Sequence, residues 1–417
     1  MKRFNFFSCS GRRGLDDSKH GTDRSTRCLS GERGLGIFMV SMFFLLWGSL
    51  LSAQTTGPQF GGRFFLDFSS FSLDDSLEMR FPEQGTGGVE FRMISFHAKG
   101  KAGKNLSYKA QIAIQNGNIR LQDVYLKVRD LPGLGGALYL GHFPEPLTLS
   151  SQVSFNHAVF MERHAVSGYM PRRNTGLMYE RLFLHEHLGL QAAVFFDTDG
   201  TTGKAMLINQ NLHRNVRLSG LLIKRPEKQL WLLAGLAYSQ RRPSKGNYTF
   251  RPTQSNHLEP KLLSYSVEQV QRVELPTAQL LLIAGPFSAQ AEYVKGSIDK
   301  LDNPDLIAVP SFYGLLSFFL TGEHRRFKNL NAGLGHPKIK KPFDPKKGQW
   351  GAWEIAVRAE QSEIALSESD RTYLREYTMG LNVYFNSQFR LMLNYVLSDV
   401  NGRGREQAGM LRLQLNY

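Results

Sequence analysis

Apolar and polar residues alternate along most of this chain, and helical periodicity is weak by comparison. The last eight residues, 410–417, show the alternation clearly as Met-Leu-Arg-Leu-Gln-Leu-Asn-Tyr. Because successive side chains of a strand point to opposite faces, the three leucines share one face with the terminal Tyr417, whereas Arg412, Gln414 and Asn416 share the other. The pattern predicts a final strand with one apolar face and one polar face, ending on an aromatic ring.

Three further segments predict antiparallel hairpins, with turns at Gly285-Pro286, at Asn386-Ser387 and near Arg225-Pro226. Each arm holds about 9–11 alternating residues, the length at which a tilted strand spans a bilayer. Strands of soluble β-sandwiches also alternate, but they are usually shorter, at about 5–6 residues. In lipid, every backbone polar group must pair within the protein, and strands achieve this only in a closed barrel. The pattern therefore favours a transmembrane antiparallel β-barrel, with a secreted soluble β-protein as the alternative.

Alternating strand directions also predict which connections share one end of such a barrel. If Tyr417 lies at the periplasmic end, residues 362–374 and 398–407 form outer loops. The segment 322–349 is then periplasmic, and it is long and rich in lysine and arginine. Two expectations follow for this segment: it guides anions at the inner mouth, or it is an ordinary solvated loop.

The N-terminus has the features of an export signal. Residues 35–51 form an apolar stretch, preceded by Arg24, Arg27 and Arg33 and followed by the small-residue site Leu51-Ser52-Ala53. This order predicts a signal peptide over residues 1–53 with a long basic region, cut after Ala53, and a single domain over residues 54–417. An N-terminal anchor helix is the alternative.

The 417-residue chain is basic, and most of the excess charge lies beyond the predicted cut. Residues 1–53 hold eight of the 51 Lys and Arg residues and four of the 36 Asp and Glu residues, so the remainder carries a formal charge of +11. That balance suits anionic lipid, anionic solutes or nucleic acid, and export argues against nucleic acid. Both cysteines, Cys9 and Cys28, precede the cut, so we expect no disulfide and no thiolate metal site in the domain.

The chain shows no recognisable catalytic motif. His185-Glu-His187 lies between two apolar arms and is interpreted as a polar turn, not as a metal pair. No glycine-rich phosphate loop connects a strand to a helix, and no nucleophile lies in a strand–turn–helix elbow. We therefore expect no enzyme activity, no cofactor and no metal.

An ordered series of short motifs runs through residues 58–417. The chain resembles the phosphate-selective porin O/P family of Gram-negative outer membranes in the following segments: Gly61-Gly-Arg-Phe-Phe-Leu-Asp-Phe68, Val89–Phe96, Asp123–Val128, Leu138–Phe143, Leu149–Gln152, Phe160-Met-Glu-Arg163, Arg173-Asn-Thr-Gly176, Gly285–Tyr293, Leu320-Thr-Gly-Glu323 and Gly351-Ala-Trp-Glu354.

The resemblance implies a trimeric porin of 16 strands in the outer membrane, whose third outer loop folds inward and narrows the pore. It also implies contact with lipopolysaccharide, and recognition of the C-terminal Tyr417 by the barrel assembly machinery. Four residues match arginines that face the pore in this family or lie on its constricting loop and arginine ladder: Arg63, Arg92, Arg163 and Arg251. Guanidinium groups bind phosphate through paired charge-assisted hydrogen bonds, so these four are the predicted anion-binding residues.

The chain departs from the family pattern at several positions. Met93 replaces the second arginine of a pair, Leu147 and Gln152 stand where relatives carry lysines, and Ile114 stands where they carry an acid. Fewer cations should bind anions more weakly and discriminate less. The sequence therefore predicts a water-filled channel for small anions such as phosphate. The alternatives are a weakly selective general porin, a secreted β-protein that binds glycans or a surface partner, and a structural barrel with a plugged lumen.

Overall fold

The computed structural model describes residues 57–417, apart from residues 83–84, 116, 171–172, 200, 205–211, 244–245, 301–306, 368–369 and 402. The predicted signal peptide and its cut after Ala53 lie outside the described residues. Among the residues described, no helix is long and apolar enough to cross a membrane.

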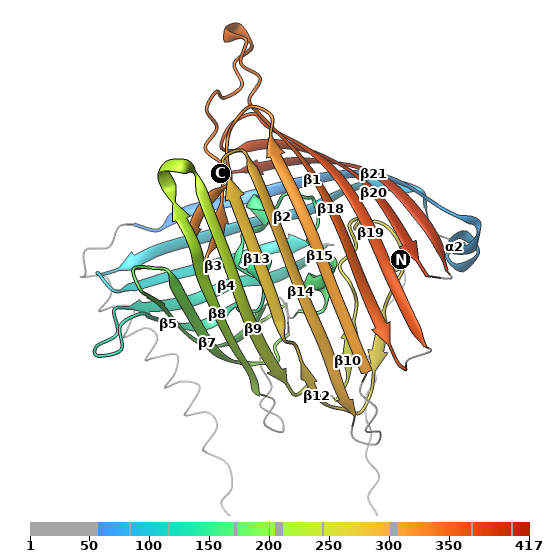
Figure 1. The fold of residues 1–417 in the computed structure, drawn as a ribbon, viewed down its shortest axis with the longest axis horizontal. Helices are drawn as coiled ribbons and strands as arrows, with labels where there is room; N and C mark the ends of the chain where they lie inside the picture. The colour runs from blue at the N-terminus through green and yellow to red at the C-terminus, as the bar shows by residue number, and fades with distance from the viewer. Residues whose placement is uncertain are drawn as a thin grey trace, which may run out of the picture. The chain divides into compact units, whose positions relative to one another are not determined.

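A single antiparallel sheet closes on itself to form a barrel (Figure 1). Closure comes from the pairing of the first strand with the last, in which Arg63 lies opposite Asn416 and Leu73 opposite Glu406. The strands of the wall are β1 Gln59–Leu73, β2 Gly87–Ala102, β3 Leu106–Gln115, β4 Asn118–Arg129, β5 Ala137–Pro144, β6 Arg173–Phe183, β7 Leu188–Phe196, β8 Leu212–Arg225, β9 Leu230–Arg241, β12 Val270–Glu274, β13 Thr277–Ala284, β14 Phe287–Lys300, β15 Ile307–Phe319, β18 Ala352–Ala365, β19 Arg371–Tyr384, β20 Phe389–Val400 and β21 Gly404–Asn416.

These 17 segments fill 16 strand positions, because β12 and β13 both pair with β9 on one side and with β14 on the other. The interruption falls at Leu275-Pro276. Proline has no N–H to donate to the ladder, so it is compatible with a break in the strand. The predicted 16-stranded antiparallel barrel is confirmed.

Short elements occupy several of the connections. They are the helices α2 Asp75–Arg80 and α3 Leu149–Gln152, the 3-10 turns η1 Phe155–His157, η2 Ala165–Gly168, η3 Pro226–Lys228 and η4 Pro345–Lys347, and the small hairpins of β10 Tyr248–Phe250 with β11 Tyr265–Val267 and of β16 Arg326–Asn329 with β17 Gly333–Gly335.

The two faces of the wall separate as the sequence alternation predicts. In β21, Arg412 is 1% exposed and lies on the inner side, whereas Leu415 is 42% exposed and lies on the outer side. The three predicted hairpins are also present: β8–β9 turns at η3, β13–β14 at Gly285-Pro286, and β19–β20 at residues 385–388. An apolar outer surface and a polar inner surface are typical of a barrel that spans lipid.

Three connections enter the barrel: segments 145–170 and 246–269, and the first part of segment 320–351, whose residues 340–350 are largely exposed. β1 begins beside the C-terminus, where Gly62 N donates to Tyr417 O at 2.9 Å. Because strand directions alternate, segments 145–170 and 246–269 enter from the end opposite to Tyr417, and segment 320–351 enters from the same end as Tyr417. Segment 145–170 is therefore the third connection at its end of the barrel, the position at which the sequence predicts an inward loop.

The expectation of a solvated loop at 322–349 is only partly correct. Residues 340–350 are largely exposed, whereas Arg325 and Leu330 are each 1% exposed. Leu330 and Leu334 pack with Leu149 and Val153 of segment 145–170 in one apolar cluster. The cause is a short run of apolar residues within an otherwise basic segment, which gains by leaving water.

Candidate functional site: a basic cavity along one side of the lumen

A polar cavity of about 630 Å³ lies between the β1–β6 wall and the inward segments. Lys109 and Gln115 both line it and lie six residues apart on β3, so the cavity extends about 20 Å along the wall. Gln115 ends β3 near the outer turn, and Lys328 belongs to the segment that enters from the opposite end. The cavity therefore runs along the lumen from one half of the barrel towards the other.

Basic residues outnumber acidic ones around this cavity. Three acidic residues line it, Asp123, Glu162 and Asp197, against seven basic ones, Arg63, Arg92, Lys109, Arg120, Arg163, Arg173 and Lys328. The lining thus has four excess positive charges, in a space where water is restricted and charges act more strongly than in bulk solvent.

Two of the acids are fully engaged by neighbouring cations. Asp123 accepts from Lys109 and, at 2.7 Å, from Arg173 Nε. Glu162 accepts from Arg92 Nε at 2.7 Å and from Arg92 Nη2 at 2.9 Å. Arg92 and Glu162 cancel each other's charge, whereas the two cations on Asp123 keep one net positive charge.

The electrostatics of Glu162 reflect its setting inside the lumen. Burial acts to raise the pKa of Glu162, but Arg92 and Arg412 outweigh burial and hold that pKa well below its usual range. The carboxylate therefore stays charged at physiological pH and keeps Arg92 in a fixed position.

The positive field comes mainly from Arg63, Arg120 and Lys328. Among the described residues, none of these three forms an ion pair, and Arg63 is 8% exposed at the cavity surface. Burial, followed by Arg326, Lys99 and Lys109, lowers the pKa of Lys328. The three cations belong to β1, β4 and segment 320–351, so separate parts of the fold supply them.

A β-bulge brings Arg92 and Met93 to the inner face together. Phe65 pairs with Met93 and Leu66 with Phe91, so Arg92 is the extra residue of the pair β1–β2. A bulge inserts one residue and breaks the strict alternation of faces. Strict alternation would place Arg92 and Met93 on opposite faces, and this bulge lets both side chains reach the lumen.

Other lumen arginines hold segment 145–170 by its main chain. Arg390 donates to Ala158 O at 2.8 Å and to Val159 O at 3.0 Å, and Arg358 donates to Glu162 O at 3.1 Å. Arg325 donates to His157 O at 3.1 Å, and Arg412 donates to Met161 O. These donors come from β18, β20, β21 and segment 320–351, so segment 145–170 reaches the wall opposite its own flanking strands.

Segment 246–269 packs on the same framework. Ser255 N donates to Glu376 Oε1 at 3.1 Å, and Arg358 Nη2 donates to Ser255 Oγ at 2.7 Å. Thr253 N donates to Ala165 O of segment 145–170 at 3.3 Å. The three inward segments therefore pack on one another and on the wall from β8 round to β21, and the basic cavity lies beside β1–β6.

The structure brings together three of the four arginines selected from the sequence. Arg63, Arg92 and Arg163 line the cavity, and Arg163 also donates to Val153 O at 3.0 Å within segment 145–170. Arg251 does not line it: the side chain is exposed, with its Nε 3.4 Å from Ser264 Oγ. Arg241, another arginine of the inner wall, is buried with its Nη1 2.7 Å from Glu145 Oε2.

Sequence reasoning missed several residues of the cavity, notably Asp123, Arg120 and Lys328. In the sequence, Asp123 and Arg173 appeared only as members of the motifs that resemble the family. Their contact joins β4 to β6 across 50 residues. Lys328 lies in the basic connection that the sequence did flag for the inner mouth. Ile114, at the position expected for an acid, is 40% exposed on the outer face.

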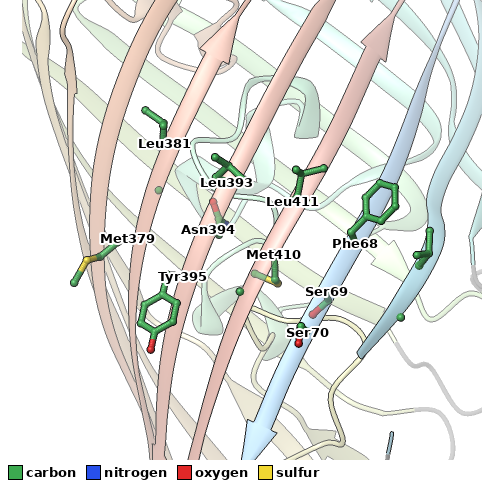
Figure 2. Close-up of a pocket in the computed structure, with 14 residues that line it drawn as sticks. Phe68, Ser69, Ser70, Met379, Leu381, Leu393, Asn394, Tyr395, Met410 and Leu411 are labelled. Carbon is green, nitrogen blue, oxygen red and sulfur yellow. The ribbon is translucent and has the colours of Figure 1, made fainter. Parts of the chain in front are cut away.

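An apolar hollow of about 820 Å³ lies on the outer face of the wall and has no such chemistry. Figure 2 shows Leu381, Leu393, Leu411 and Phe68 in one row across β19, β20, β21 and β1, with Tyr395 and Met379 in the next. Gly409 completes that lower row opposite Tyr395 and leaves a gap in the surface. This lining suits hydrocarbon and not a hydrated ion.

The closed sheet has the fold of outer-membrane porin barrels. Solved structures support this at the level of the fold. An outer-membrane OmpT of Vibrio cholerae covers 87% of this chain and 99% of its own with a TM-score of 0.54 at 11% identity. DcaP of Acinetobacter baumannii aligns with a TM-score of 0.54 at 8% identity and covers 86% of this chain and 97% of its own. An anion-selective porin from Comamonas acidovorans aligns with a TM-score of 0.50 at 10% identity and covers 87% of this chain and 100% of its own.

Sequence comparison matches part of the chain to a family. Residues 246–417 match the family described as phosphate-selective porin O and P, which confirms the resemblance predicted from the motifs. Porin O of Pseudomonas aeruginosa is 30% identical over 146 residues, which are 31% of this chain and 32% of that protein. The aligned part thus spans about a third of that curated relative.

Proposed function

We propose that the protein is an outer-membrane channel through which small anions diffuse passively into the periplasm. The observation that carries this proposal is the cavity along the β1–β6 wall, with seven basic and three acidic residues in its lining. An anion inside it meets a net positive field along its length, whereas a cation is repelled.

Carboxylates already engage several of the cavity cations, which favours flow over tight binding. A channel conducts only when each site holds its ion weakly enough to release it. Glu162 and Asp123 bind Arg92, Lys109 and Arg173, so fewer of their donors remain for a passing anion. Phosphate is expected to pass with weak binding, because Met93 removes one guanidinium from the wall.

The inward fold of segment 145–170 supports a narrow passage. Its main chain is held by arginines from the opposite wall, so the open cross-section is reduced to the side that the cavity occupies. No catalytic role is expected for these residues, since their arrangement offers an environment for ions and no reacting pair.

The test is the reversal potential of the purified full chain in planar bilayers under a potassium chloride gradient. A chloride preference supports the proposal, and a potassium preference contradicts it. Absence of conductance would favour a structural barrel with a plugged lumen. A chloride current that phosphate leaves unchanged would favour a weakly selective general porin of the same fold.

The proposed setting is the outer membrane of a Gram-negative bacterium, after export and removal of residues 1–53. We infer a homotrimer, for which a trimer form of the OmpT of Vibrio cholerae is a precedent at the level of the fold. Recognition of the terminal Tyr417 by the assembly machinery and contact of rim arginines with lipopolysaccharide belong to the same proposal. Cross-linking of the detergent-solubilised protein tests the trimer.

A further inference from the structure

The basic cavity also presents apolar and aromatic surface to its contents. Met93 and Leu121 line it from the wall, Val153 lines it from segment 145–170, and Tyr125 and Phe155 line it with rings. These side chains stand among the cations of the same cavity. A hydrated inorganic ion gains nothing from such surface, and it loses water contacts beside it.

The Tyr125 ring belongs to a fixed aromatic group on the inner wall. Its centroid lies 5.3 Å from that of Tyr139 and 6.1 Å from that of Phe143, and the Phe143 ring lies 5.1 Å from Phe195. Rings held at such distances pack favourably and keep a defined orientation. Tyr125 is partly exposed, so a solute in the cavity can contact this group.

Phe155 supplies a second ring from segment 145–170. The guanidinium carbons of Arg163 and Arg412 lie 5.4 Å and 5.5 Å from the centre of this ring, and Phe65 packs against it at 5.8 Å. These cation–π contacts fix the ring at the cavity wall. A solute between β4 and segment 145–170 therefore meets ring surface on two sides.

Arg63, Arg120 and Lys328 come from three elements, and none of them forms an ion pair among the described residues. Asp123 already engages Lys109 and Arg173, so fewer of their donors remain for a solute. A multiply charged inorganic anion is bound best where several donors converge. A singly charged group with an apolar body needs one donor and a hydrophobic surface, and the cavity offers both. Its volume of about 630 Å³ is also within the range of organic-ligand sites.

We infer that the preferred solutes are organic monoanions that carry an apolar ring, such as aromatic carboxylates. This inference rests on the proposed anion channel and specifies its solute class. The carboxylate pairs with one cavity cation at a time, while the ring contacts Tyr125 and Phe155.

The experiment compares benzoate with acetate, because the two share a carboxylate and differ by the ring. Each is added at pH 7 to the purified full chain in planar bilayers carrying a chloride current. Benzoate is expected to interrupt the current at a concentration at least about tenfold lower than acetate, and phosphate no better than acetate. In Tyr125→Ser, the half-blocking concentration of benzoate should rise about fivefold or more while that of acetate is unchanged.

Two further variants complete the test. Met93→Arg should weaken benzoate block and strengthen phosphate block, because it exchanges apolar surface for a donor. Tyr377 carries an outer-face ring that is 53% exposed. Tyr377→Ser is therefore the matched control and should change neither benzoate block nor phosphate block. Equal block by benzoate and acetate in a chloride-selective channel would overturn this inference and leave the proposed function standing. A potassium-selective channel would remove the proposed function itself.

Discussion

Neutralising Arg63 tests the origin of the anion preference directly. Arg63 lies at the cavity surface and forms no ion pair among the described residues, so Arg63→Gln removes one of four excess positive charges without freeing a carboxylate. The wall should keep its fold, since glutamine is polar and, being shorter than arginine, fits the same space.

The magnitude follows from Coulomb's law. An anion about 4 Å from a guanidinium gains roughly 1 kcal/mol in bulk water and roughly 4 kcal/mol at an effective dielectric constant near 20. The lumen lies between these limits, so the lower figure is a minimum. Because 1.4 kcal/mol is a factor of ten, the chloride-to-potassium permeability ratio should fall by about fivefold or more.

The assay is the reversal potential under a potassium chloride gradient, measured for Arg63→Gln beside Arg251→Gln. Arg251 is an exposed arginine on segment 246–269 that does not line the cavity, so its neutralisation removes the same charge from outside the passage. An unchanged ratio in Arg63→Gln, or an equal fall in both variants, would refute the reasoning that the cavity sets selectivity.

Three other outcomes follow from the same geometry. Arg412→Met leaves Asp67 buried without the guanidinium that binds it at 2.7 Å and 2.6 Å, so the variant should lose about 3–5 kcal/mol of stability. Urea-induced unfolding in detergent measures this loss, and an unchanged unfolding midpoint would contradict it. Burial and neighbouring cations lower the pKa of Lys328, so anion selectivity should decline with rising pH before an ordinary lysine titrates. Lys328→Arg should keep its anion selectivity over the same pH range, and identical pH profiles of the two proteins would count against a role for Lys328. Burial and the adjacent Glu406 raise the pKa of Glu259 well above its usual range, so the protonated form stabilises segment 246–269 at low pH and this stabilisation is lost as pH rises through that pKa. The loss should raise the current noise of the channel between pH 5 and 9, and Glu259→Gln should abolish that rise; noise that stays pH-dependent in the variant would disprove this.

The wall of this barrel is readable from the sequence because each strand contacts lipid on one side. Leu411, Leu413 and Leu415 must alternate with Arg412 and Gln414 for that reason alone, and the turn at Gly285-Pro286 marks where pairing ends. Neither inference needs any knowledge of distant residues.

The cavity could be predicted only in part. Arg63 and Arg163 were found through their motifs, but the face of Arg92 depends on a bulge, and the exclusion of Arg251 depends on how segment 246–269 packs. The pairing of Asp123 with Arg173 depends on strand register. The burial of Leu330 inside a basic connection depends on partners more than 100 residues away, such as Arg217, which donates to its carbonyl at 3.1 Å.

The arginines that hold segment 145–170 donate hydrogen bonds to main-chain carbonyl oxygens, which every amino acid possesses. Arg390, Arg358 and Arg325 would find the same acceptors whatever side chains residues 157–162 carried. Selection, or a designer, can therefore exchange the residues that project from this stretch while its path across the barrel persists. The permeability of the lumen can therefore change among related proteins while the barrel and the path of this segment stay the same.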